Sequence, residues 1–144
     1  MRDDRQVSFA KYGPWAVVAG GSEGVGAEFA LQLADAGLNL VLFARKPGPL
    51  ESTARECSRR GVEVRTLPID LAESGAVEAV TSFTDGLEIG LLIYNAGANT
   101  ASAEFLDAEL PAFQRVIDVN VTTMMALLQH YGRAMSDRRR GGIV

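Results

Sequence analysis

The chain of 144 residues has a formal net charge of −4 and is 47% hydrophobic and 22% charged, which is typical of one globular domain with a sizeable core. The net negative charge gives no electrostatic basis for binding nucleic acid or an anionic membrane, and no stretch of sequence is long and apolar enough to span a membrane. The N-terminal segment is charged, and the single cysteine, Cys57, cannot form an intrachain disulfide, so we expect a cytoplasmic protein.

An apolar run over residues 15–19 stops at glycine and is followed by apolar residues at helical spacing. This pattern predicts a strand, a tight turn and a helix over residues 24–36, with Val25, Phe29 and Leu33 on its packed face. The glycine that follows this helix is a typical helix stop. The first predicted strand is therefore followed by a turn and a helix.

Two further strands and a helix follow. Residues 38–44 are almost all apolar, as in a central parallel strand that is covered on both faces. A second helix is predicted over residues 50–60, after a break that contains two prolines. Residues 62–69 alternate between apolar and polar side chains and include Pro68, which cannot donate a hydrogen bond to a neighbouring strand. We therefore expect an edge strand there.

The second half of the chain continues the alternation. A third helix is predicted over residues 72–83, a fourth strand over residues 89–94, and a long helical stretch over residues 109–136. From 116 to 128 this stretch is apolar nearly all round, so we expect the sheet to cover one side and a partner subunit the other. Residues 141–144 have the pattern of the entry to a fifth strand.

Strands that alternate with helices predict a parallel sheet with right-handed crossovers, in which the third strand lies at an edge. The expected fold class is α/β, a doubly wound parallel sheet (Rossmann fold) that is truncated in the fifth strand. Residues 1–144 contain no linker or internal repeat, so we expect a single domain over these residues. We expect it to form a homo-oligomer through the helix at 109–136.

The turn after the first strand has the spacing Gly-x3-Gly-x-Gly, formed by Gly20, Gly24 and Gly26. One glycine allows a sharp turn, one allows a ligand to approach the backbone, and one allows the helix to pack closely on the strand. The free N–H groups at the start of the helix then favour a pyrophosphate. Because the spacing differs from the common Gly-x-Gly-x-x-Gly fingerprint, an ordinary glycine-rich turn is the alternative.

In dinucleotide-binding sheets, the residues just after the second strand contact the ribose of the dinucleotide. An acidic residue there holds a free 2′-hydroxyl, whereas an arginine accommodates a 2′-phosphate. The sequence has Arg45 and Lys46 at this point, which predicts that NADP(H) is preferred over NAD(H). A solvated basic pair in a loop is the structural alternative.

Four motifs, in this order, resemble those of the classical short-chain dehydrogenase/reductase family. Residues 19–26 are similar to the family's Thr-Gly-x3-Gly-x-Gly cofactor turn, with alanine in place of threonine. Asp70-Leu71 resembles the acidic pair that contacts the adenine ring. Residues 94–97 are similar to the Asn-Asn-Ala-Gly motif, with tyrosine first, and Asn120 lies where the family has the asparagine of its Asn-Ser-Tyr-Lys tetrad.

The resemblance implies hydride transfer between a nicotinamide cofactor and a small-molecule carbonyl or secondary alcohol, with a catalytic role for Asn120. Residues 12–15 and 37–42 are most similar to hydroxysteroid dehydrogenases and long-chain 3-ketoacyl reductases. The sole histidine, His130, has no cysteine or second histidine near it, so we expect no metal site. The expected cofactor-binding residues are Gly20, Ser22, Glu23, Gly24, Val25, Gly26, Arg45, Lys46, Asp70, Leu71, Asn95, Ala96 and Gly97.

The sequence departs from the family pattern in two respects. Glu23 stands where family members that prefer NADP often carry a basic residue. The catalytic Tyr-x3-Lys is absent: the tyrosines at 12, 94 and 131 are followed four residues later by alanine, alanine and methionine. Because the tyrosine transfers the proton while hydride moves, we expect the 144-residue chain alone to be inactive, as the cofactor-binding part of an enzyme that lacks the catalytic serine, tyrosine and lysine.

Two other functions are alternatives. A non-catalytic module that senses NAD(P) would need neither the tyrosine nor the lysine. A methyltransferase also has a glycine turn for its nucleotide, but it usually needs an acidic residue after the second strand, and Arg45 argues against it.

Overall fold

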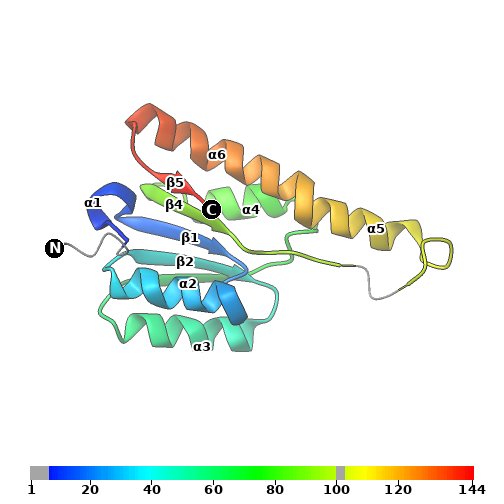
Figure 1. Ribbon diagram of the computed structural model, residues 1–144, viewed down its shortest axis with the longest axis horizontal. Coiled ribbons are helices and arrows are strands. Elements are labelled where there is room, and N and C mark those ends of the chain that lie inside the picture. Colours follow the sequence, from blue (N-terminus) through cyan, green and yellow to red (C-terminus); the bar gives the residue numbers. More distant parts are fainter. Residues whose placement is uncertain (1–6, 100–102) are drawn as a thin grey trace.

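The computed structural model describes residues 7–99 and 103–144. Its centre is a parallel sheet of five strands in the order β3-β2-β1-β4-β5 (Figure 1). The strands are β1 Trp15–Ala19, β2 Asn39–Ala44, β3 Val64–Pro68, β4 Ile89–Tyr94 and β5 Gly142–Ile143. The helices are α1 Phe9–Tyr12, α2 Gly24–Asp35, α3 Pro47–Ser58, α4 Ala76–Phe83, α5 Leu110–Ile117, the π-helical turn η1 Asp118–Thr122 and α6 Thr123–Arg138. This confirms the predicted doubly wound α/β fold.

Helices cover both faces of the sheet (Figure 1). Alternate strand residues point to opposite faces, so Val18 and Leu42 pack with α2 and α3, whereas Val17, Val41 and Leu92 pack with α4 and α6. The central strands are therefore buried on both sides, and β2 is almost wholly apolar for this reason.

The predicted edge position of β3 is confirmed. The strand pairs with β2 and ends in Pro68, whose missing N–H costs nothing on the outer side of the sheet. The neighbouring helix α3 buries Cys57 completely. Burial raises the pKa of the Cys57 thiol to about 11, so the group is a core side chain rather than a nucleophile at neutral pH.

Two helix starts differ from the predicted ones. Helix α3 begins at Pro47, three residues earlier than expected, because prolines are tolerated in a first turn where the N–H groups have no intrahelical partner. Helix α4 begins at Ala76, four residues later than expected, after turns that end in Gly75 at a φ of +82°.

The predicted placement of Val25 on the packed face of α2 is wrong: its side chain is 64% exposed. The first turn of α2 is instead buried at Gly26.

The predicted long helical stretch is present, but it is interrupted by the π-helical turn η1 between α5 and α6. Leu127 and the η1 residue Val119 are buried against the sheet, which confirms that the sheet covers one side. On another side Ile117, Val121 and Met125 are 45% to 62% exposed at intervals of four residues. We call these three residues the apolar stripe.

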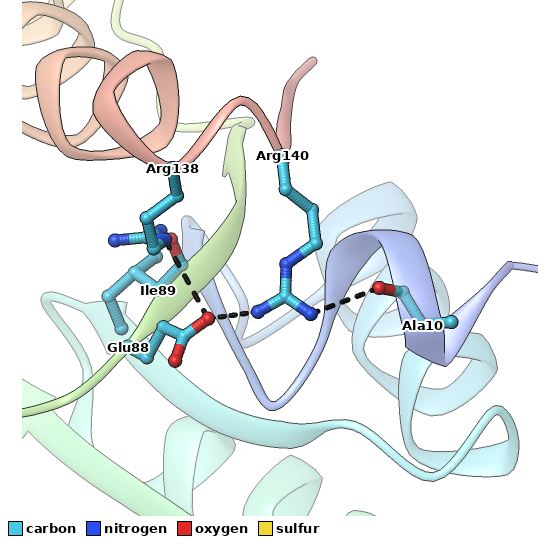
Figure 2. Close-up of polar contacts among 5 residues, drawn as sticks. All are labelled: Ala10, Glu88, Ile89, Arg138 and Arg140. Carbon is cyan, nitrogen blue, oxygen red and sulfur yellow. Dashed lines mark hydrogen bonds and ion pairs between the residues drawn. The ribbon is translucent and has the colours of Figure 1, made fainter.

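The end of α6 is tied to the amino-terminal end of the sheet (Figure 2). Arg138 and Arg140 both form ion pairs with Glu88, which lies just before β4. Arg138 also donates a hydrogen bond to the carbonyl of Ile89, and Arg140 donates one to the carbonyl of Ala10 in α1. Because β5 begins two residues after Arg140, these contacts hold the chain where it enters the sheet beside β4.

Candidate functional site

A cavity of about 800 Å³ opens at the carboxyl ends of β1, β2, β3 and β4. In doubly wound sheets this edge binds the ligand. The cavity is lined by the glycine turn, by the segments that follow the strands, and by one face of α5 and η1. Its lining residues are Gly20, Ser22, Glu23, Phe43, Ala44, Arg45, Ile69, Asp70, Leu71, Ala72, Asn95, Ala96, Gly97, Ala98, Asn99, Ala112, Arg115, Val116, Val119 and Asn120.

The glycine turn is held tightly between two strands. Gly20 has a φ of +85°, and its N–H and that of Gly21 both donate to the carbonyl of Phe43 on β2. A Cβ at Gly20 would lie 2.8 Å from the N atom of Ala96 beyond β4. The turn therefore needs glycine at position 20 both for its conformation and for the space.

The start of α2 packs directly on this turn. A Cβ at Gly26 would lie 1.8 Å from the carbonyl oxygen of Gly20 and 2.9 Å from the Asn95 side chain, which donates to the same carbonyl over 3.5 Å. The close contact of Gly26 is thus with the turn itself, not with the strand under the helix. Gly24 is different: it has a φ of +56°, and a Cβ there would meet nothing within 4 Å.

The N-terminus of α2 has unused hydrogen-bond donors. The side chain of its N-cap residue, Glu23, makes no capping hydrogen bond. The first N–H groups of a helix have no intrahelical partner, and they carry the positive end of the helix dipole. The glycines leave a backbone cradle that Cβ atoms would fill, and this cradle lies beside the free N–H groups. Such an arrangement fits the pyrophosphate of a dinucleotide.

Charged residues lie at the ends of β2 and β3. Arg45 and Asp70 both line the cavity, whereas Lys46 is the N-cap residue of α3 and is outside the lining. Asp70 Oδ1 accepts a hydrogen bond from the Ala72 N–H over 3.0 Å, and Oδ2 forms an ion pair of 2.5 Å with Arg115. Partial burial opposes ionisation, but these donors outweigh it and lower the pKa of Asp70.

Asn120 lies in the π-helical turn and faces the loop after β4. Its Oδ1 accepts the N–H of Ala98 over 3.0 Å, and its Nδ2 donates to the carbonyl of Ala98 over 2.8 Å. The hydroxyl of Tyr94 donates to the carbonyl of Val119 over 2.6 Å. Burial raises the pKa of Tyr94 to about 12, so this phenol stays protonated. The carboxyl end of β4 and the helix are therefore joined at Asn120.

The structure brings most of the expected site residues to one cavity. Four of them lie outside its lining: Gly24, Val25, Gly26 and Lys46. Sequence reasoning did not find Ala112, Arg115, Val116 and Val119, which come from the helical stretch. Their spacing of three or four residues marks one helix face, but nothing in the sequence shows that this face closes the cavity rather than packing in the core.

Within residues 7–99 and 103–144, no group of three or more histidine, cysteine, aspartate or glutamate residues is arranged to hold a metal ion. No helix in the same part of the chain has the length and apolar character of a membrane span.

Comparison with known proteins points to one family. A sequence model of the short chain dehydrogenase family matches residues 14–144. The chain is 33% identical over 135 residues to the 7beta-hydroxysteroid dehydrogenase of Clostridium sardiniense, covering 93% of this chain and 51% of that protein. It is 35% identical over 139 residues to the very-long-chain 3-oxoacyl-CoA reductase of Laccaria bicolor, covering 94% and 41%. The chain thus spans about half the length of these relatives.

Solved structures agree with this. A structure from work on 7beta-hydroxysteroid dehydrogenase stereoselectivity matches with a TM-score of 0.89 and 31% identity over 94% of this chain and 52% of that one. A short-chain dehydrogenase from Sphingobium yanoikuyae in complex with NADPH matches with a TM-score of 0.82 and 31% identity, over 90% and 52%. An NAD⁺-bound xylitol dehydrogenase matches with a TM-score of 0.78 and 30% identity, over 92% and 52%. On this evidence the chain belongs to the short-chain dehydrogenase/reductase family of oxidoreductases.

Proposed function

We propose that the chain is the NADP(H)-binding part of an oxidoreductase that transfers hydride between nicotinamide and a carbonyl or secondary alcohol. The cavity at the carboxyl ends of the strands, with its glycine cradle and Arg45, is the observation that carries this proposal. The relatives described above are dehydrogenases and reductases, which favours an enzyme over a non-catalytic sensor of NAD(P).

The residues of the cavity have separate roles in this proposal. The turn at Gly20 and the N-terminus of α2 bind the pyrophosphate, and Arg45 binds the 2′-phosphate. The loop after β4, which Asn120 holds, forms the wall beside the nicotinamide. The dinucleotide supplies the hydride, and the chain supplies binding and orientation.

The first prediction is that Arg45 sets the preference for the 2′-phosphate. NADPH is expected to bind more tightly than NADH, by about ten- to hundred-fold for one charge-assisted contact. Arg45→Asp should abolish this preference, because the carboxylate repels the phosphate and accepts a hydrogen bond from a free 2′-hydroxyl. Fluorescence titration of both reduced cofactors measures the two affinities.

Arg55→Asp is the matched control, since Arg55 is an exposed arginine of α3 outside the cavity lining. This variant should keep the preference of the unmodified chain. Equal affinities for NADPH and NADH in the unmodified chain would refute the preference for NADP(H). Binding of neither cofactor would refute the proposed function.

The second prediction concerns self-association through the apolar stripe. Ile117, Val121 and Met125 expose adjacent apolar surface along one side of the α5–α6 stretch, and burying it against a second copy would be favourable. We propose a homo-oligomer formed through this stripe. Val121→Glu should produce a 15.4 kDa monomer, because an unpaired carboxylate would be buried at the interface.

Light scattering after size-exclusion chromatography gives the mass. Ser136→Glu adds the same charge at an exposed position near the end of α6 and should leave the oligomer intact. A monomeric unmodified chain would contradict this prediction, as would a Val121→Glu variant of unchanged mass.

A further inference from the structure

Strand β5 is held to the sheet by few contacts of its own. Two residues, Gly142 and Ile143, pair with β4. Ile143 and the following Val144 are 43% and 66% exposed, so docking of β5 buries little apolar surface. Elements with few buried apolar contacts open at a low free energy. Contacts outside the strand therefore decide how firmly β5 stays beside β4.

Such contacts converge on Glu88, which lies just before β4 (Figure 2). Its carboxylate pairs with Arg140, two residues before β5, and with Arg138, whose Nε lies 3.6 Å from Oε1. Arg138 also donates to the Ile89 carbonyl over 2.6 Å, and Arg140 donates to the Ala10 carbonyl over 3.1 Å. One carboxylate thus joins the end of α6 and the chain entering β5 to the start of β4, and Arg140 extends the network to α1.

The turn that leads α6 into β5 has a backbone conformation that other contacts must hold. Arg139, between the two arginines, has a φ of +53°, which residues with a side chain rarely adopt. Such a conformation persists where the surrounding structure fixes it. The side chains on both sides of Arg139 are those that pair with Glu88. The ion pairs therefore stabilise a turn that local preference disfavours.

The residue after β5 lies beside the carboxyl end of β4. The Val144 N–H donates to the Leu92 carbonyl, and the Tyr94 N–H donates to the Val144 carbonyl, both over 2.9 Å. The next residue, Asn95, lines the cavity, and its N–H bonds to Ala19 of β1 instead. Release of β5 would therefore leave the Tyr94 N–H without its partner at the edge of the cavity, and would leave the β1 side of β4 intact.

We propose that Glu88, Arg138 and Arg140 form an ionic latch, which keeps β5 in the sheet when closed and releases β5 as a unit when open. The three side chains are 30% to 41% exposed, so dissolved ions reach them. Raising the salt concentration from about 0.1 M to about 1 M shortens the Debye length from about 10 Å to about 3 Å and weakens such pairs. The edge of the cavity beside β4 is therefore sensitive to ionic strength, although the latch lies at the opposite end of the sheet.

The test is amide hydrogen exchange of the 144-residue chain, followed by NMR. The N–H groups of Tyr94 and Val144 report docking of β5, and the N–H of Asn95 reports the β1 side of the same strand. Glu88→Gln should speed exchange at Tyr94 and Val144 about three- to tenfold, as expected for the loss of two exposed ion pairs, and leave Asn95 unchanged. About 1 M sodium chloride should have the same effect on the unmodified chain and little effect on Glu88→Gln.

Glu63→Gln is the matched control, because it removes the carboxylate of another exposed ion pair, formed with Arg65 at the β3 edge of the sheet. This variant should leave exchange at both β5 reporters unchanged. Arg140→Gln should act like Glu88→Gln. Combining the two substitutions should add little, because both remove the same ion pair.

Unchanged exchange at Tyr94 and Val144 in folded Glu88→Gln would overturn the latch. Equal acceleration at Asn95 would do so too, because the whole sheet would then be destabilised. If Glu88→Gln does not fold, the salt series on the unmodified chain decides: an exchange rate at Tyr94 that does not respond to salt, relative to that at Asn95, excludes an ionic latch. Acceleration confined to the β5 side, in both Glu88→Gln and high salt, would support it.

Discussion

Gly26→Ala is expected to abolish binding of NADPH, with a loss of affinity of at least about a hundredfold. The added Cβ would lie 1.8 Å from the carbonyl oxygen of Gly20, so either the turn or the first residues of α2 must move. Either movement displaces the N–H groups that we propose for the pyrophosphate. Overpacking of this kind typically costs about 1–3 kcal/mol of stability, so the variant should still fold, with helical circular dichroism largely retained.

Gly48 gives the matched control, and Gly24 gives a second test of the turn. A Cβ at Gly48 in α3 meets nothing within 4 Å, so Gly48→Ala should leave binding unchanged. Gly24→Ala also has free space, but its φ of +56° makes alanine strained by about 1–2 kcal/mol. Gly24→Val should likewise prevent binding, because its larger side chain would project beside the pyrophosphate. Cofactor titration measures the NADPH affinity of each variant. If folded Gly26→Ala binds NADPH as tightly as the unmodified chain does, the glycine turn has only a structural role.

The polypeptide of residues 1–144 is expected to bind NADPH and to catalyse no measurable carbonyl reduction. A positioned acid contributes about 10²- to 10⁴-fold to the rate of such a step, and its pKa has to lie near the working pH. None of the three tyrosines lines the cavity. Tyr94 donates to the carbonyl of Val119 and has its pKa raised to about 12 by burial. Tyr131 is buried, shares a hydrogen bond of 2.8 Å with Thr84, and has a pKa raised by burial.

The third tyrosine, Tyr12, lies at the wrong end of the sheet. Its backbone is next to Gly90 near the start of β4, away from the carboxyl ends of the strands. Lysines are present only at 11 and 46, and neither follows a tyrosine by four residues. Oxidation of NADPH, followed at its absorbance band with a keto steroid and a 3-ketoacyl thioester, should match the rate without protein. Protein-dependent turnover that survives Tyr94→Phe would show that another group supplies the proton.

The sequence by itself determined the fold class, because the strands of the sheet and the helices that connect them are marked by local patterns of apolar residues, glycine and proline. The apolar run of β2, the proline in β3 and the glycines that end two helices are all properties of short segments. Their physical consequences do not depend on distant residues. The same holds for Gly20, where a positive φ is needed whatever the turn binds. The edge position of β3 was therefore predictable before any contact between elements was known.

Only the tertiary structure decided which side chains meet across elements. The pairing of Asp70 with Arg115, the hydrogen bond from Tyr94 to η1, and the ion pairs of Glu88 with Arg138 and Arg140 (Figure 2) join residues 25 to 52 positions apart. A helical pattern predicts that one face is apolar, but the crossing of the helix over the sheet decides which residues reach the cavity and which remain exposed. For this reason Arg115 could not be distinguished in the sequence from an ordinary surface arginine, and Val25 was assigned to the packed face. The side chains that line a cavity depend on how separate elements are placed, and that placement results from packing of the whole core.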